Sequence, residues 1–147
     1  MRDRAADLQQ IIEATYRHAR GVDRADPEEA IRAFTDDAVW DATALGFERL
    51  VGRESLLNFL RSDAVLVAEQ FHILANHIIE FDGPTTAHGT CYLFSEARTK
   101  SGSFLKVAML NEDSYRETSV GWQIAVRVVS LLTTPHIENP HYGAVFQ

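Results

Sequence analysis

The spacing of apolar residues changes once along the chain, close to residue 70. Before this point apolar residues recur every three or four positions, as on one face of a helix, and after it every two positions, as in a strand. The first part predicts a helix over residues 5–22, a second helix beginning at Asp26 and a third one after Gly52. Between the second and third helices it predicts a turn at 35–37 and a short strand at 38–42. The second part predicts strands over residues 71–81, 85–96, 104–116 and 120–133.

Helices that precede a run of antiparallel strands are typical of an α+β fold, not of a parallel α/β fold. The start of the second helix is marked locally, because Asp26 is a good N-cap, Pro27 suits the first helical position and Glu29 completes a capping box. The 147 residues predict one domain, over residues 1–134. Residues 135–147 contain two prolines and a glycine, and we expect them to form an irregular tail.

Several of the predicted strands are apolar on both faces. Strict alternation over residues 71–81 places Leu74 and Ile78 on one face. On the other face it places Phe71, Ile73, Ala75, Ile79 and Phe81. An antiparallel sheet with one face in water is usually polar on that face. We therefore expect one face to pack against the helices and the other against a second copy of the chain, in a homo-oligomer such as a dimer or trimer.

Composition and charge narrow the possible functions. Apolar residues make up 46% and charged residues 24% of the chain, as in ordinary folded domains. With 21 acidic and 14 basic residues the net charge is −7, which disfavours nucleic acids and anionic membranes as partners. The single cysteine, Cys91, excludes an internal disulfide framework and a multi-cysteine zinc site. No apolar run approaches the ~18 residues of a membrane span, and the first residues lack the apolar block of a secretory signal, so we expect a cytoplasmic protein.

Common catalytic motifs, such as glycine-rich nucleotide loops, do not occur, so the candidates are polar residues at positions where apolar ones are expected. Asp23 continues the buried stripe of the first helix, where a carboxylate is hydrogen-bonded or has a raised pKa. The alternative is a loop aspartate that bonds nearby amides. His72 shares a strand face with Leu74 and Asn76, and it could be an enclosed general base or a hydrogen-bonded core histidine. His77 is expected on the opposite face, so that His72 and His77 cannot bind one metal ion.

The later strands carry further candidates. The second long strand places small side chains around Ser95 on one face, which leaves room for a ligand or allows close packing of a helix. The third long strand carries Asn111 and Asp113 in an apolar row that includes Met109. Either polar residue could bind a ligand, and Asp113 could instead pair with Arg127 on the next strand, because a buried charge needs a partner.

The tail has two possible roles. His136, Glu138 and His141 could hold a zinc ion, although a flexible tail is the favoured interpretation. The tail could also close a pocket, with Tyr142 and Phe146 as apolar plugs.

Taken together, these residues resemble the SnoaL-like branch of the NTF2-like superfamily. The resemblance spans about residues 8–133 and depends on the order and spacing of several short segments. They are Tyr16, Gly21-Val22-Asp23, Phe34-Thr35-Asp36-Asp37-Ala38-Val39-Trp40, Gly52-Arg53, His72-Ile73-Leu74-Ala75-Asn76, and Gly121-Trp122-Gln123-Ile124-Ala125 with Arg127. The resemblance implies a cone, in which a curved mixed or antiparallel sheet wraps around three N-terminal helices and encloses an apolar pocket. This fold hosts both enzymes and binding domains, so it does not define the function by itself.

The resemblance also implies roles for particular residues. Dehydratases and dehydrochlorinases of this branch carry an aspartate after the first helix and a histidine on the first long strand, and Asp23 and His72 match both. Asn111 matches a substrate-contacting asparagine. Where those enzymes have a functional tyrosine or lysine this chain has His18, which we expect to donate a proton. Ser95 replaces an assisting acid or histidine, and its hydroxyl can only form hydrogen bonds at neutral pH.

The implied function is that of a cofactor-free and metal-free lyase acting on a small, largely apolar substrate. His72, oriented by Asp23, would remove a proton from carbon, and His72 or His18 would protonate the leaving hydroxyl. The residues expected to contact substrate are Tyr16, Trp40, Asn76, Ser95, Met109 and Asn111. The same base could drive a double-bond shift or a polyketide ring closure, and a third possibility is a non-catalytic binding or scaffold domain.

Overall fold

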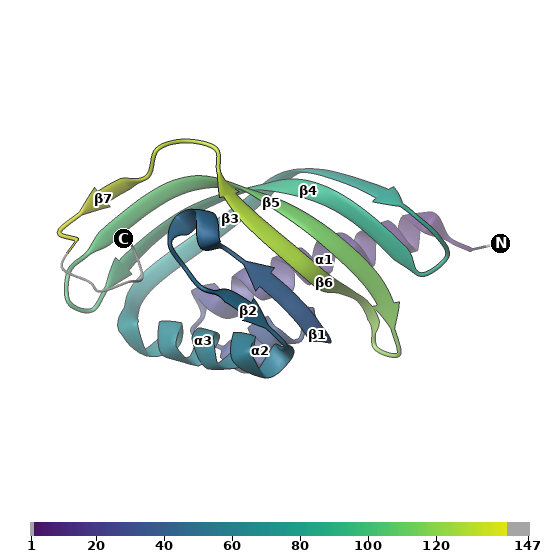
Figure 1. Ribbon diagram of the computed structural model, residues 1–147, viewed down its shortest axis with the longest axis horizontal. Helices are drawn as coiled ribbons and strands as arrows, with labels where there is room; N and C mark the ends of the chain where they lie inside the picture. The colour runs from purple at the N-terminus through teal and green to yellow at the C-terminus, as the bar shows by residue number, and fades with distance from the viewer. Residues whose placement is uncertain (1, 141–147) are drawn as a thin grey trace.

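The computed structural model describes residues 2–140, which form three α-helices, one short 3₁₀ helix and a seven-stranded sheet. α1 (Arg4–Asp23) runs beneath the sheet, and α2 (Pro27–Ile31) and α3 (Arg53–Leu66) pack at one end of it. The long strands arch over these helices (Figure 1). The α+β class predicted from the sequence is confirmed. None of the helices in the described residues is long and apolar enough to cross a membrane.

The sheet contains both parallel and antiparallel neighbours. Its strands are β1 (Phe34–Asp41), β2 (Arg49–Val51), β3 (Val67–Phe81), β4 (Thr86–Thr99), β5 (Phe104–Thr118), β6 (Gly121–Leu131) and β7 (His136–Glu138). The order across the sheet is β2-β1-β6-β5-β4-β3, and β7 pairs with β5. β1 and β6 are parallel, and every other pair of neighbouring strands in the described residues is antiparallel.

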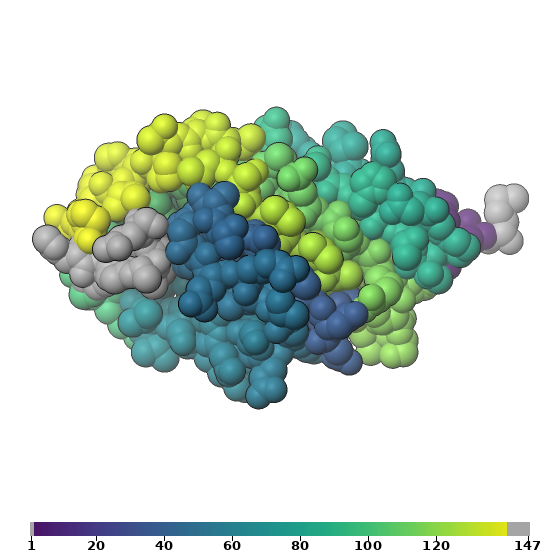
Figure 2. Space-filling model, viewed as in Figure 1, coloured from purple at the N-terminus to yellow at the C-terminus, as the bar shows by residue number. Residues whose placement is uncertain are grey.

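Two segments that the sequence predicted to be irregular are strands. Residues 35–37 belong to β1, because Phe34 and Thr35 are buried and Phe34 pairs with Ile124 of β6. His136–Glu138 forms β7 against the start of β5. Both pairings join segments that lie far apart in the sequence, so the local turn-forming residues gave no sign of them. Between β1 and β2 the 3₁₀ helix η1 (Thr43–Leu45) lies beside β6, and this blue segment stands in the middle of the face seen in Figure 2.

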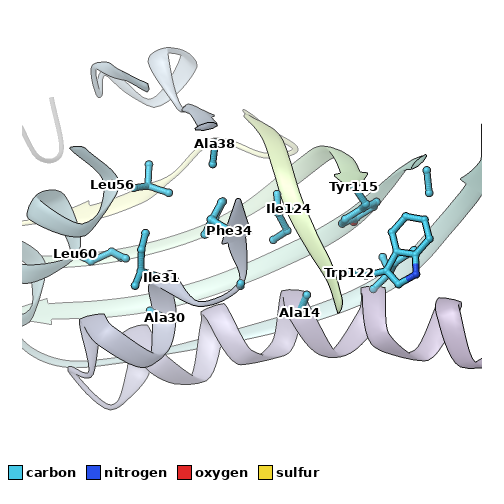
Figure 3. Packing of buried hydrophobic residues seen from close by; sticks show 13 residues of the cluster. Ala14, Ala30, Ile31, Phe34, Ala38, Leu56, Leu60, Tyr115, Trp122 and Ile124 are labelled. Atoms are coloured by element: carbon cyan, nitrogen blue, oxygen red, sulfur yellow. The ribbon is translucent and has the colours of Figure 1, made fainter. Parts of the chain in front are cut away.

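The main hydrophobic core lies between α1 and the inner face of the sheet (Figure 3). Ile11, Phe34 and Ile124 are completely buried, and burial of each such side chain contributes about 1.5–3 kcal/mol. At one end of this core the indole N–H of Trp122 donates to Asp7 at 3.0 Å. A second apolar cluster around Met109 and Val129 lies further along the sheet, so the inner face is not filled by one continuous core.

The end of α1 is held against α2 by a glycine. A Cβ atom on Gly21 would lie 2.4 Å from the backbone nitrogen of Ala30, closer than two such atoms can approach. The absence of a side chain at Gly21 therefore lets the two helices touch. This contact fixes the position of the C-terminal end of α1, which carries Asp23.

A β-bulge at Asn76 reverses the faces of β3. On its two sides the pairs are Ala75 with Tyr92 and Ile78 with Thr90. Two residues of β3 therefore oppose one residue of β4, and the alternation of side chains shifts by one position. Asn76 has a φ of 55° and its side chain is exposed. Asparagine tolerates this left-handed conformation better than most residues do.

The bulge corrects the face assignment made from strict alternation. His77, Ile79 and Phe81 face α1 and the core, on the same side of the sheet as His72, whereas Ile78 faces outward and is 64% exposed. The prediction that His72 and His77 lie on opposite faces was therefore wrong. A period of two cannot reveal a single inserted residue, because the residues on each side of the insertion alternate normally.

The outer face of the sheet is apolar along β3 and β4. Ile73 is 57% exposed, and Phe71, Ile78 and Tyr92 are exposed on the same face. These side chains form a contiguous apolar surface, because β3 and β4 pair directly.

We predict that Asn76→Ala lowers the free energy of unfolding by about 1 kcal/mol, because alanine pays the steric penalty of positive φ. Asn76→Gly, the matched control, should leave the stability nearly unchanged, because glycine adopts this conformation freely. Urea unfolding of the three proteins measures the difference. Equal stabilities for the alanine and glycine variants would contradict the left-handed bulge.

Candidate active site

A cavity of about 360 Å³ lies between the inner face of the sheet and helices α1 and α3. Most of its wall is apolar, with Trp40, Phe47 and Phe59 in mutual ring contact on one side. The polar side chains that line it are His18, Asp63, Gln70, His72, Ser95, Asn111 and Arg127. A cavity of this size with a few polar groups is typical of a site for a small, largely apolar molecule.

Asp23 and His72 are in contact at this cavity. The Nδ1 atom of His72 lies 2.6 Å from Oδ1 of Asp23, and the backbone N–H of His72 donates to Oδ2 at 3.1 Å. His72 lines the cavity, whereas Asp23 lies behind it, outside the lining. Because a carboxylate accepts, Nδ1 carries the hydrogen and Nε2 of the neutral imidazole is left as the basic nitrogen. Asp23 thus bonds β3 instead of the loop amides near it.

His18 is held in one tautomer by the backbone. Its Nδ1 lies 3.3 Å from the carbonyl oxygen of Ala30, and the ring stands edge-on to Phe34. The carbonyl can only accept, so Nδ1 carries the hydrogen and Nε2 is an acceptor. Burial lowers the pKa of His18 to about 3, with the nearby Arg127 charge acting in the same direction. The expectation that His18 donates a proton is therefore corrected: at neutral pH it is an uncharged ring whose one N–H is already used.

A buried ion pair lies at the floor of the cavity. Arg127 donates through Nε and Nη2 to the two oxygens of Asp113, both at 2.8 Å, and the hydroxyl of Tyr115 donates to Asp113 at 2.9 Å. Both charged side chains are almost fully buried. The predicted Asp113–Arg127 pair is confirmed, and it holds a guanidinium group against the cavity.

Asn111 carries an unsatisfied polar atom. Its side chain is completely buried, its Nδ2 lies 3.7 Å from the sulfur of Cys91, and its Oδ1 has no hydrogen-bond partner among the described residues. A buried carbonyl without a partner costs about 1–3 kcal/mol. Because Asn111 lines the cavity, a bound molecule with a hydroxyl or N–H group can supply the missing bond.

The other predicted contact residues divide into two groups. Trp40, Ser95 and Met109 line the cavity, as expected. Tyr16 and Asn76 do not line it. Tyr16 is 42% exposed and lies edge-on to His77, and Asn76 is turned outward by the bulge. Both residues match the family pattern by their position in the sequence, but the local backbone directs their side chains away from the cavity.

Sequence reasoning missed two polar residues of the lining, Asp63 and Gln70. A signal for Asp63 was present, because it follows Leu56 and Leu60 at helical spacing and continues the buried stripe of α3. This is the criterion that singled out Asp23 on α1. Gln70 gave no comparable signal, since the strand was expected to begin after it.

The first part of the tail reaches the cavity. Pro135 and Ile137, before and within β7, line it. His136 bonds Glu138 at 3.0 Å. The described residues contain no group of three or more potential metal ligands, and His141, Tyr142 and Phe146 lie outside these residues.

Comparison with known proteins agrees with this architecture. The model of the SnoaL-like domain family matches residues 3–128. A candidate aromatic ring hydroxylase from Novosphingobium aromaticivorans superposes with a TM-score of 0.87 at 22% identity, covering 91% of this chain and 94% of its own. A candidate scytalone dehydratase from the same organism has a TM-score of 0.82 at 17% identity, with coverages of 90% and 88%. A hexachlorocyclohexane dehydrochlorinase has a TM-score of 0.75 at 18% identity, with coverages of 94% and 91%. None of the curated proteins matches the sequence.

The curved sheet with the helices beneath it belongs to the NTF2-like class of fold, which a solved NTF2-like protein shares. Within that class, the chain belongs to the SnoaL-like family. At these identities the solved structures establish the fold alone, so the chemistry has to be argued from the cavity itself.

We predict that His18 makes the protein sensitive to acid. Its pKa is about 3 when folded against about 6.5 when unfolded, so the unfolded chain binds more protons between these values. This contribution is fully present well above pH 6.5 and is lost as the pH falls toward 3, by about 2 kcal/mol at pH 5. His18→Gln keeps a donor for Ala30 but does not titrate, so its urea-unfolding stability should fall less between pH 7 and 5. Parallel losses in both proteins would contradict this cause.

Proposed function

We propose that this protein is a cofactor-free lyase that eliminates water from a small, largely apolar substrate. The observation that carries the proposal is the Asp23–His72 hydrogen bond, which leaves the second imidazole nitrogen as a base on a mostly apolar cavity. Solved structures with the same fold include a candidate dehydratase and a dehydrochlorinase, whose names both describe eliminations. Together these findings favour an elimination begun by proton abstraction.

In the proposed reaction Nε2 of His72 takes a proton from a carbon atom next to a carbonyl group. Asp23 keeps the imidazole in the reactive tautomer and stabilises the imidazolium that forms. Two of the five N–H groups of Arg127 bond Asp113, and the other three, which have no side-chain partner among the described residues, face negative charge on the substrate oxygen. Asn111 accepts from a substrate hydroxyl through its unsatisfied oxygen.

Two alternatives start from the same cavity. The same base can move a double bond or close a ring, since these reactions also begin with proton abstraction from carbon. A binding or scaffold role would need the cavity but not the basic nitrogen. The mass of the product separates elimination, which loses water, from isomerisation, which loses nothing.

We expect purified protein to accelerate the elimination of 5-nitrobenzisoxazole, a flat apolar probe that opens to a coloured phenolate when a base removes its carbon-bound proton. His72→Gln should lower the rate by about 10²–10⁴-fold. His77→Gln is the matched control, because His77 also faces α1 but bonds Thr15 and does not line the cavity. A wild-type rate no higher than that of imidazole in solution, or a fully active His72→Gln variant, would contradict the proposal.

We also propose that two or more copies associate through the outer face of β3 and β4. Ile73 and Ile78 lie at its centre, and their burial would remove a large apolar surface from water. Light scattering should give a mass that is a multiple of 16.5 kDa, and Ile73→Glu with Ile78→Glu should reduce it to the monomer. Val120→Glu, at an exposed turn, is the control. A wild-type mass of one chain would contradict the association.

A further inference from the structure

Elimination of water needs an acid as well as a base, because hydroxide is a poor leaving group. Among the described residues, the titratable side chains that line the cavity are His18, Asp63, His72 and Arg127. His72 is occupied as the base, and the guanidinium of Arg127 does not release its proton. His18 is neutral and has given its only N–H to Ala30. Asp63 is the group left that can carry a transferable proton.

Asp63 is fixed next to the Asp23–His72 pair. It lies in the last turn of α3, and its Oδ2 accepts from Nε2 of Gln70 at 2.8 Å. The same Nε2 donates to the carbonyl of Val22, the residue before Asp23, at 3.2 Å. Gln70 stands two residues before His72 and on the same face of β3, about 7 Å along the strand. Asp63 is therefore placed at the same end of the cavity as the base.

The surroundings of Asp63 favour the proton-bearing form. Burial raises the pKa of its carboxyl group above the usual value, and the Gln70 bond and the nearby His72 only partly oppose this. The C-terminal end of a helix, where Asp63 lies, also disfavours a negative charge. Its Oδ1 has no hydrogen-bond partner among the described residues, so a proton on that oxygen can be directed into the cavity.

We propose that Asp63 is the general acid of this site and that the leaving group of the substrate is therefore a hydroxyl group. The inference rests on the proposed elimination. His72 takes the proton from carbon, the electrons of that C–H bond form the double bond, and the C–O bond breaks as Asp63 gives its proton to the departing oxygen. The products are the alkene and water, with an imidazolium and a carboxylate on the protein. The proton on His72 then returns to Asp63 through the released water, which restores both groups.

Two ketones that differ only in the leaving group test this role. 3-Hydroxy-1-tetralone and 3-acetoxy-1-tetralone both yield 1-naphthol after elimination, and acetate leaves without an acid whereas hydroxide does not. Asp63→Asn keeps an acceptor for Gln70 and should lower kcat/KM for the hydroxy ketone by about 100-fold or more. For the acetoxy ketone the loss should be less than about tenfold. Asp63→Glu should recover part of the lost activity, because it restores the proton.

The controls separate this inference from the proposed function. Glu54→Gln removes an exposed carboxylate from the same helix and should change neither rate. His72→Gln should lower both rates, and unchanged rates in that variant count against the elimination mechanism as a whole. Equal losses for the two ketones in Asp63→Asn, or no loss, would overturn the role of Asp63 alone.

If neither ketone reacts, a measurement that needs no substrate still tests the role of Asp63. In a ¹³C titration of the side-chain carboxyls, the signal that Asp63→Asn removes should have its midpoint above the usual aspartate value. A midpoint at or below the usual value would overturn the proposal, because Asp63 would then hold no proton to give.

Discussion

The contact between Asp23 and His72 ties the helices to the sheet and at the same time sets the tautomer of the imidazole that we propose as the base. One carboxylate oxygen accepts from the backbone of β3 and the other from the imidazole. The carboxylate of Asp23 reaches β3 from the last residue of α1, and the close contact of Gly21 with Ala30 of α2 holds this end of the helix in place. A packing contact between two helices therefore sets the orientation of an imidazole on a strand. The rest of the cavity wall is arranged around this fixed point.

Local sequence signals predicted the fold class, the three helices and the four long strands. The cap at Asp26 holds as expected, since its side chain accepts from the N–H of Glu29. The features of the fold that these signals did not predict depend on contacts between segments distant in the sequence. Residues 35–37 lie in a strand that pairs with β6 at Phe34 and Val39, on either side of them, and the bulge at Asn76 depends on the register with β4. Such features are set by partners distant in sequence, which hydrophobic periodicity does not report.

The candidate site shows the same difference between features with a local sequence signal and features set by distant contacts. Asp23 and His72 were found because a polar residue on a buried stripe is unusual wherever the stripe packs. The expected role of His18 failed because its tautomer is set by the carbonyl of Ala30, a backbone atom that no side-chain pattern reveals. The family resemblance led to a residue that lines the cavity, but not to the hydrogen bond that fixes its ring. The hydrogen-bond partners of a side chain decide what it can do.

The bulge at Asn76 divides β3 into two stretches whose inward side chains lie in different surroundings. Before it, Gln70, His72 and Leu74 face the cavity, and after it Ile79 and Phe81 pack against the main core. One extra residue thus lets a single continuous strand line the cavity along its first stretch and pack into the hydrophobic core along its second. Substitutions in the first stretch can reshape the cavity while the side chains that hold the domain together stay unchanged. The residues of β3 that shape the cavity are therefore different from those that stabilise the core.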